Sequence, residues 1–152
     1  PIPGNQTLDP GAVEAGVRAI HQPYHEAIAR LLDQRDTAGQ QTVLVSVHSF
    51  TPVYLEQPRP WHLGLLYGDD KRVAEGLFDY FAADDSLCVG DNQPYQVDDK
   101  DHSVPEHAFR RGLANILFEI RQDLVATEAA QQAWAARLTA GLRHALDRKS
   151  VV

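Results

Sequence analysis

Apolar positions along the chain follow a strand period in some segments and a helix period in others. Short runs rich in β-branched and aromatic residues predict strands at 41–49, 61–67 and 115–120, with a weaker one at 86–89. Apolar residues at three- and four-residue spacing predict helices from Pro10 to near Arg35, after Asp70, from Pro105 to Arg111 and after Thr127. The alternation predicts an α/β fold, with a mixed, largely parallel sheet flanked by helices.

Local signals mark the helix ends. Asp9, Asp70 and Thr127 are good N-cap residues, and Gly112 suits the left-handed residue that closes a helix. Pro23 lies inside the first helix and is expected to kink or interrupt it. The last helix carries one apolar stripe, formed by Ala130, Trp134, Leu138, Leu142 and Leu146.

Length and charge narrow the class of protein. The 152 residues suffice for a single domain, residues 1–152, with a real core, and the net charge of −7 argues against nucleic acid or an anionic membrane as partner. No apolar run approaches the roughly 20 residues of a membrane span. With one cysteine, Cys88, there is no internal disulfide, which favours a cytoplasmic location. The Pro/Gly-rich start, "PIPGNQTLDP", and the lack of methionine suggest the C-terminal part of a longer polypeptide.

A carboxylate and a guanidinium interrupt the strand predicted at 115–120. Glu119 and Arg121 stand two residues apart in "NILFEIRQD", so they share one face of the strand. Burying a charge is costly unless it is paired or coordinated. The pair is either a structural ion pair or a sign of chemistry at this position.

His48 ends another predicted strand. Because ligands bind beyond the carboxyl ends of strands in open α/β sheets, His48 and Glu119 could serve as a metal ligand and a general base. Zinc suits a histidine nitrogen and lowers the pKa of a bound water. A histidine at a strand end is more often structural, so both interpretations stand at this point.

Other polar residues are weaker candidates. His21 and His25 have the four-residue spacing of a helical metal clamp, although a packed helix edge explains them better. Ser49 follows His48 directly, so the two side chains should diverge and a Ser/His nucleophile is improbable. Arg111 could bind a substrate carboxylate or decorate a helix. A long polar loop and its flanks contain Asn92, Tyr95, His102 and His107.

Several blocks of sequence resemble the N-formylglutamate amidohydrolase family. They are "PIPGN", "IHQPYHEAI", "VSVHSFTPVY", "RPWHLGLLY", "GDNQPY" and "RRGLANILFEIRQDL". They occur in the order of the family, from the first residues to about Leu124. The resemblance implies a fold like that of the zinc carboxypeptidases. It also implies hydrolysis of N-formyl-L-glutamate to formate and glutamate, a step of histidine degradation.

The resemblance assigns roles by position. It makes His48 one of three zinc ligands and Glu119 the general base and acid that acts on the zinc-bound water. Arg121 would orient Glu119 or meet substrate charge. The residues that match positions in or near the substrate pocket are Arg111, Asn92, Tyr95 and His107.

The chain departs from the family pattern in one respect. The first two zinc ligands, a histidine and an acidic residue close together, have no counterpart, since no His-x-x-Glu occurs. We therefore expect the second half of an active site, completed by a missing N-terminal segment, and an exposed sheet edge that favours self-association. The alternatives are an amidohydrolase or carboxypeptidase-like enzyme for another N-acyl amino acid or small peptide, and a non-catalytic domain that binds a ligand or partner.

Overall fold

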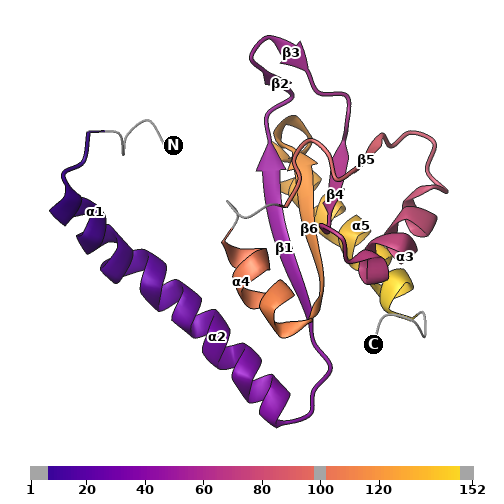
Figure 1. The fold of residues 1–152 in the computed structure, drawn as a ribbon. Coiled ribbons are helices and arrows are strands. Elements are labelled where there is room, and N and C mark those ends of the chain that lie inside the picture. The colour runs from indigo at the N-terminus through magenta and orange to yellow at the C-terminus, as the bar shows by residue number, and fades with distance from the viewer. Residues whose placement is uncertain (1–6, 98–101, 148–152) are drawn as a thin grey trace. The chain divides into compact units, whose positions relative to one another are not determined.

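A computed structural model describes residues 7–97 and 102–147 of the chain (Figure 1). The chain divides into two compact units, residues 1–42 and residues 43–152. The first unit is a helical segment, and the second contains the sheet with its helices.

The helical unit begins where the sequence predicts. The Asp9 side chain accepts a hydrogen bond of 3.0 Å from the Ala12 N–H, as an N-cap does. Pro23 interrupts the helix by a π-helical turn, in which the Gln22 N–H bonds to the Val17 carbonyl five residues back. The wider turn carries the chain past a residue that has no N–H to donate. The elements are α1 (Pro10–Gly16), the π-helical η2 (Val17–His21) and α2 (Gln22–Thr37).

The second unit is built on a mixed four-stranded sheet with the order β1-β6-β4-β5 (Figure 1). β1 is parallel to β6 and β4 is parallel to β5, while β4 and β6 are antiparallel. The strands are β1 (Val43–Phe50), β4 (Leu63–Leu66), β5 (Val89–Asp91) and β6 (Ala114–Arg121). A separate hairpin consists of β2 (Val53–Tyr54) and β3 (Gln57–Pro58).

Helices cover both faces of this sheet. Asp70 and Thr127 accept hydrogen bonds from the first turns of α3 and α5, so both predicted caps form. α3 and α5 pack on the face that carries Phe118, whereas α4 packs on the face that carries Leu117. The helical elements are α3 (Lys71–Phe81), α4 (Ser103–His107), α5 (Glu128–Leu146) and the 3-10 turns η3 (Phe109–Arg111) and η4 (Gln122–Val125).

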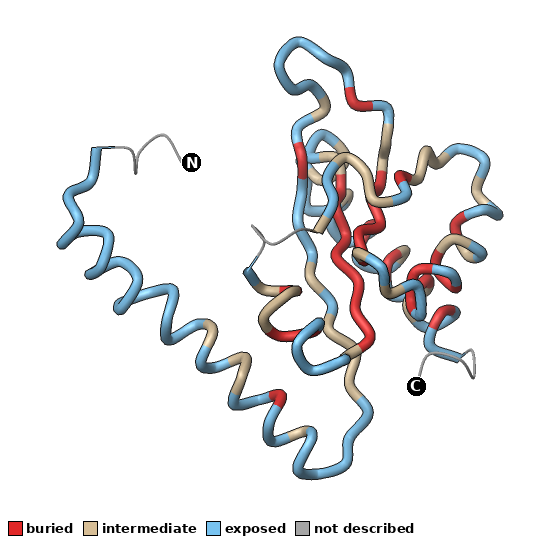
Figure 2. The backbone as a smooth tube through the Cα atoms, viewed as in Figure 1, coloured by how far each residue is buried: buried red, intermediate tan, exposed pale blue. Residues whose placement is uncertain are grey.

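β6 forms the centre of the core. All its residues from Ala114 to Ile120 are buried, and the strand is the longest buried stretch in Figure 2. A strand between two neighbours and two helical layers has no exposed face, which explains its continuous apolar run. The same burial surrounds Glu119, which is 5% exposed.

The predicted fold class is confirmed, and the differences are local. The hairpin β2–β3 was not predicted, because its strands have two residues each and its turn contains neither Gly nor Asn. Leu55 and Glu56 adopt positive φ values of 48° and 64° there. The prediction that Leu146 belongs to the buried stripe of α5 is wrong, since Leu146 is 39% exposed while Ala145 is buried. No helix among the described residues is long and apolar enough to cross a membrane.

A buried hydrogen bond joins the ends of β4 and β5. The Tyr67 hydroxyl donates to Asp91 Oδ1 over 2.6 Å, and this bond together with burial raises the pKa of Tyr67 to about 12. The folded state therefore favours the protonated phenol. The resulting stability is complete below the ordinary pKa near 10 and is lost as the pH rises from 10 towards 12.

We expect the free energy of unfolding to fall by about 2–3 kcal/mol between pH 10 and 12. Urea denaturation followed by circular dichroism at each pH measures this fall. Tyr67→Phe should remove most of it, whereas Tyr24→Phe, at an exposed tyrosine of α2, should leave it unchanged. Equal slopes in wild type and Tyr67→Phe would contradict the expectation.

Candidate functional site

The parallel register of β1 and β6 places His48 directly opposite Glu119. His48 Nδ1 lies 3.6 Å from Glu119 Oε1. The histidine side chain is 56% exposed, on the edge strand, while the glutamate side chain is 7% exposed. Both residues stand near the carboxyl ends of their strands, where ligands bind in sheets of this class. The arrangement offers an accessible imidazole and, behind it, a carboxylate largely shielded from water.

Two glycines make room beside Glu119. Gly64 of β4 pairs with Glu119 on one side and with Gly90 of β5 on the other. A Cβ atom at Gly64 would lie 2.1 Å from the Gln93 carbonyl oxygen, and one at Gly90 would lie 2.8 Å from Gln93 Cβ. The absence of both side chains lets the loop after β5 lie against the sheet next to the glutamate.

The same loop is held by Asn92. Its Oδ1 accepts a hydrogen bond of 3.1 Å from the Tyr67 N–H, and its backbone adopts a φ of 48°. Asparagine tolerates this left-handed conformation better than most residues do. The hydrogen bond fixes the loop to the end of β4, and the predicted contact of Asn92 with a substrate stays a prediction.

Arg121 forms an ion pair at the end of β6. Its Nε and Nη2 donate to the two Asp123 oxygens over 2.8 and 3.2 Å, and this bidentate contact lowers the pKa of Asp123. Its Nη1 lies 3.5 Å from the Arg59 carbonyl oxygen, to which it donates. Arg121 therefore connects the end of β6 to the segment that follows the hairpin.

Sequence reasoning missed Arg59. The structure places it between β3 and β4, 9% exposed, with Nη1 donating to the Tyr95 hydroxyl over 2.8 Å. Tyr95 is thereby brought to the strand ends that carry His48 and Glu119. The signal available in the sequence was the arginine of "RPWHLGLLY", but its aromatic partners are distant along the chain.

The other predicted substrate-binding residues lie on the helical segment before β6. His107 of α4 is 3% exposed, and burial lowers its pKa. Arg111 ends η3, three residues before β6 begins at Ala114. The five residue-to-residue steps from Ala114 to Glu119 span about 16 Å, so Arg111 is at the opposite end of β6 from the glutamate.

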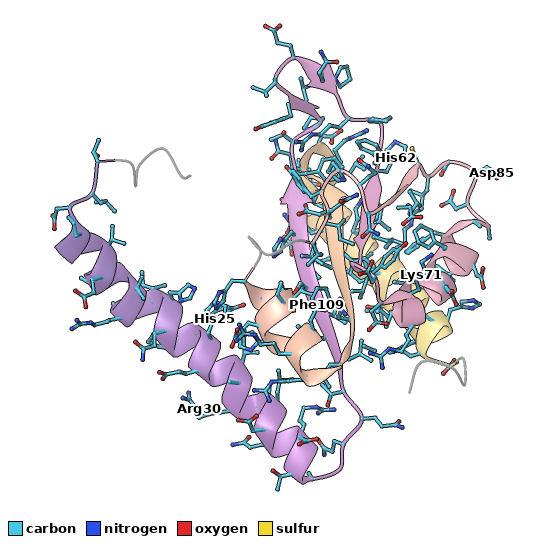
Figure 3. All side chains as sticks on the ribbon, in the orientation of Figure 1. His25, Arg30, His62, Lys71, Asp85 and Phe109 are labelled. Carbon is cyan, nitrogen blue, oxygen red and sulfur yellow. The ribbon has the colours of Figure 1, made fainter. Side chains whose placement is uncertain are left out.

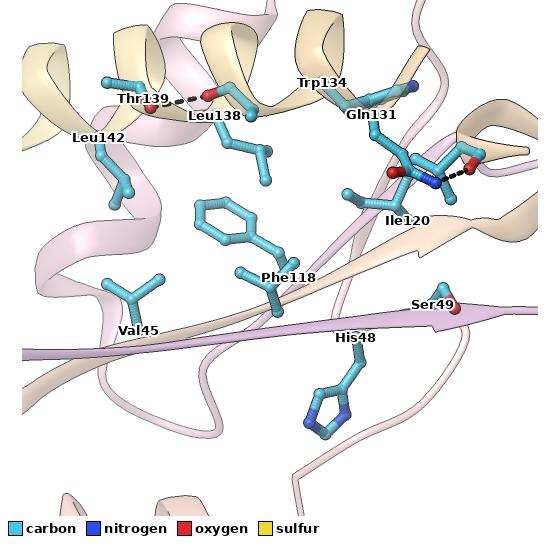
Figure 4. A pocket seen from close by; sticks show the side chains of 13 residues that line it. Val45, His48, Ser49, Phe118, Ile120, Gln131, Trp134, Leu138, Thr139 and Leu142 are labelled. Atoms are coloured by element: carbon cyan, nitrogen blue, oxygen red, sulfur yellow. Dashed lines mark hydrogen bonds between the residues drawn. The ribbon is translucent and has the colours of Figure 1, made fainter. Parts of the chain in front are cut away.

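A hollow lies on the other face of the sheet. It has a volume of about 560 Å³ and is bounded by β1, β6 and α5. Figure 4 shows Val45, Phe118 and Ser49 directed towards α5, while His48 leaves β1 on the opposite side. The predicted divergence of His48 and Ser49 is therefore observed. The lining is mainly apolar, with Ser49, Gln131 and Thr139 as polar members, and His48 contributes to it from β1 although its ring is directed away.

Other histidines make contacts of their own. His62, labelled in Figure 3, directly precedes β4 and accepts a hydrogen bond of 2.9 Å from the Cys88 N–H through Nδ1. His21 and His25 lie close together in the helical unit, with ring centroids 4.3 Å apart.

The donor set around Glu119 fits part of a zinc site. Imidazole and carboxylate groups are suitable zinc ligands, and a catalytic zinc takes three protein ligands. Within residues 7–97 and 102–147, no third histidine, cysteine or acidic residue forms a close cluster with His48 and Glu119. Within the described residues, His48 and Glu119 therefore do not by themselves make up a three-ligand zinc site.

Two comparisons with known proteins give matches. The model of the N-formylglutamate amidohydrolase family matches residues 1–126. The crystal structure of gene product Atu2144 from Agrobacterium tumefaciens is 37% identical and superposes with a TM-score of 0.87 over 96% of this chain. The chain spans 58% of the length of that protein. None of the curated proteins matches its sequence.

The close approach at Gly64 yields a prediction. Gly64→Ala should lower the free energy of unfolding by about 1–3 kcal/mol, because the new methyl group must displace the Gln93 backbone. Urea denaturation measures the change. Gly16→Ala is the matched control, since a Cβ at Gly16 of α1 meets no atom within 4 Å. If both variants have wild-type stability, the loop does not lie against Gly64.

Proposed function

Since the chain belongs to the N-formylglutamate amidohydrolase family, we propose that it carries the acid–base part of a hydrolase site that cleaves N-formyl-L-glutamate to formate and L-glutamate. The observation that supports this proposal is the buried Glu119 carboxylate beside the exposed His48 imidazole. A carboxylate in the most buried strand of the fold is costly. In this proposal, the buried carboxylate faces the water that attacks the substrate.

Glu119 is the proton-transfer group in this proposal. It takes a proton from the water that attacks the formyl carbon, and it gives that proton to the amide nitrogen as the C–N bond breaks. The products are formate and the free amine of glutamate. The loop over Gly64 lies beside Glu119, whose side chain is 7% exposed, and it limits the access of other water to the carboxylate.

His48 is a zinc ligand in this proposal. Zinc, when bound, lowers the pKa of water and polarises a carbonyl group. The His48 side chain is 56% exposed and leaves β1 on the face of the sheet that carries Glu119. The remaining ligands come from residues outside those described, consistent with a relative whose chain is considerably longer.

Removal of the base tests the acid–base assignment. Glu119→Gln should lower kcat for N-formyl-L-glutamate about 10²–10⁴-fold in the complete protein that carries this chain, measured as formate release. Glu128→Gln, at an exposed carboxylate of α5, is the control and should retain wild-type kcat. Unchanged kcat in Glu119→Gln would show that another group transfers the proton.

The same assay identifies the acyl group. Under the proposal, the complete protein hydrolyses the formyl derivative of glutamate faster than its acetyl and succinyl derivatives. Faster hydrolysis of the acetyl or succinyl derivative would retain the proposed reaction class but change the proposed substrate. No hydrolysis of any of the three, with zinc bound, would reject the proposed function.

The metal assignment has its own measurement. Zinc bound per complete protein, determined by atomic absorption, should fall at least tenfold in His48→Ala, because a catalytic site loses one of three protein ligands. Glu119→Gln should retain the zinc, since the proposal makes Glu119 a base and not a ligand. Equal zinc content in His48→Ala and wild type would place the metal elsewhere.

A further inference from the structure

Arg59 is fixed where the carboxyl ends of β1 and β6 meet. Its N–H donates to the Pro52 carbonyl over 2.8 Å, just beyond β1. Its own carbonyl accepts the hydrogen bond from Arg121 at the end of β6. The backbone of Arg59 is therefore attached to the ends of both strands that carry the candidate site.

Three aromatic rings surround the guanidinium of Arg59. The ring centroids of Tyr54, Tyr95 and Phe50 lie 4.7, 5.0 and 5.7 Å from its Cζ atom. Rings at these distances attract a cation through their π-faces. They also hold the planar group in one orientation, so that its free N–H donors have a fixed direction. We call Arg59 and these three aromatic residues the aromatic cage.

The charge of Arg59 has no carboxylate partner within residues 7–97 and 102–147. The guanidinium has five N–H donors and makes one hydrogen bond there, to the Tyr95 hydroxyl. Arg72 and Arg137, by contrast, pair with Asp70 and Asp84 at 2.7 and 3.3 Å. Arg59 as a whole residue is 9% exposed, and an anionic ligand at its remaining donors would offset the cost of taking its charge out of water.

The cage lies on the side of the sheet occupied by the candidate catalytic pair. Phe50 follows His48 by two residues in β1, so both side chains leave the same face, about 7 Å apart along the strand. The register pairs Phe50 with Arg121, as it pairs His48 with Glu119. Arg59 thus packs on the residue of β1 that directly follows the His48 position on this face.

We propose that Arg59 binds a carboxylate of the substrate and determines the specificity for an acidic amino acid. This inference rests on the proposed function and names the group that recognises the substrate. The guanidinium accommodates the two carboxylate oxygens with two parallel N–H donors. Tyr95 adds a third contact, because its hydroxyl accepts from Arg59 and can donate its own proton to the same carboxylate.

Direct binding tests the site independently of turnover. Isothermal titration of the chain with glutarate, a dicarboxylate with the carbon skeleton of glutamate, should give saturable binding. Arg59→Met should weaken that binding on the order of a hundredfold. Arg59→Lys keeps the charge but loses the two parallel N–H donors, and it should weaken glutarate binding about tenfold. Tyr95→Phe keeps the ring and should produce a smaller loss.

Arg137→Met is the matched control. Arg137 also lies over an aromatic ring, 5.3 Å from the centroid of Trp134, but has Asp84 as its carboxylate partner. Its removal should leave glutarate binding unchanged. Glutarate binding of wild-type strength in Arg59→Met, or no saturable binding to wild type, overturns the proposal. If Arg59→Met fails to fold by circular dichroism, Arg59→Lys and Tyr95→Phe decide the question by the same criterion.

Kinetics of the complete protein show which carboxylate Arg59 binds. N-formylglutamine lacks the side-chain carboxylate, and 4-formamidobutanoate lacks the α-carboxylate. Arg59→Met should reduce kcat/KM strongly for N-formylglutamate and little for the analogue that lacks the carboxylate it contacts. An equal reduction for all three substrates would make Arg59 a structural residue. If the wild type binds glutarate but does not hydrolyse N-formylglutamate, the proposed function is rejected and the carboxylate-binding site is retained.

Discussion

The arrangement of the candidate site depends on the parallel register between β1 and β6. Eight consecutive residue pairs join these strands, and one of them brings His48 opposite Glu119. A slip of one residue would turn one of the two side chains to the opposite face of the sheet. The register is secured by burial, because β6 carries apolar residues on both faces and cannot shift without exposing them. The hydrophobic core therefore fixes the geometry of a polar pair.

The sheet has different functions on its two faces. One face packs against α3 and α5 and holds most of the core, including Phe118 and Ile120. The other carries Glu119 and is approached closely by the loop around Gln93, since Gly64 and Gly90 present no side chains to it. On this face α4 packs at Leu117, two residues before Glu119, and the Gln93 loop lies against Gly64, the β4 partner of Glu119.

Local features of this protein could be predicted from the sequence, and long-range ones could not. Asp70 and Thr127 cap their helices as expected, since a cap depends on three or four neighbouring residues. The proximity of His48 and Glu119 was expected from strand ends and from the family resemblance. Arg59 could not be found in this way, because its environment combines Phe50, Tyr54 and Tyr95, which meet after the hairpin and the loop fold over the strand ends.

The hydrogen bond from Arg121 to the Arg59 carbonyl has a consequence for substrate length. It attaches the proposed carboxylate-binding group to the same strand that carries the proposed base, two residues further on. The distance between these two groups is then set by the rise of β6, which a strand holds nearly constant. On this proposal, the fixed distance between the base and the carboxylate-binding group selects substrates of one length. If Arg59 contacts the side-chain carboxylate, acidic amino acids whose side chains are one methylene shorter or longer would place either the amide or that carboxylate out of position.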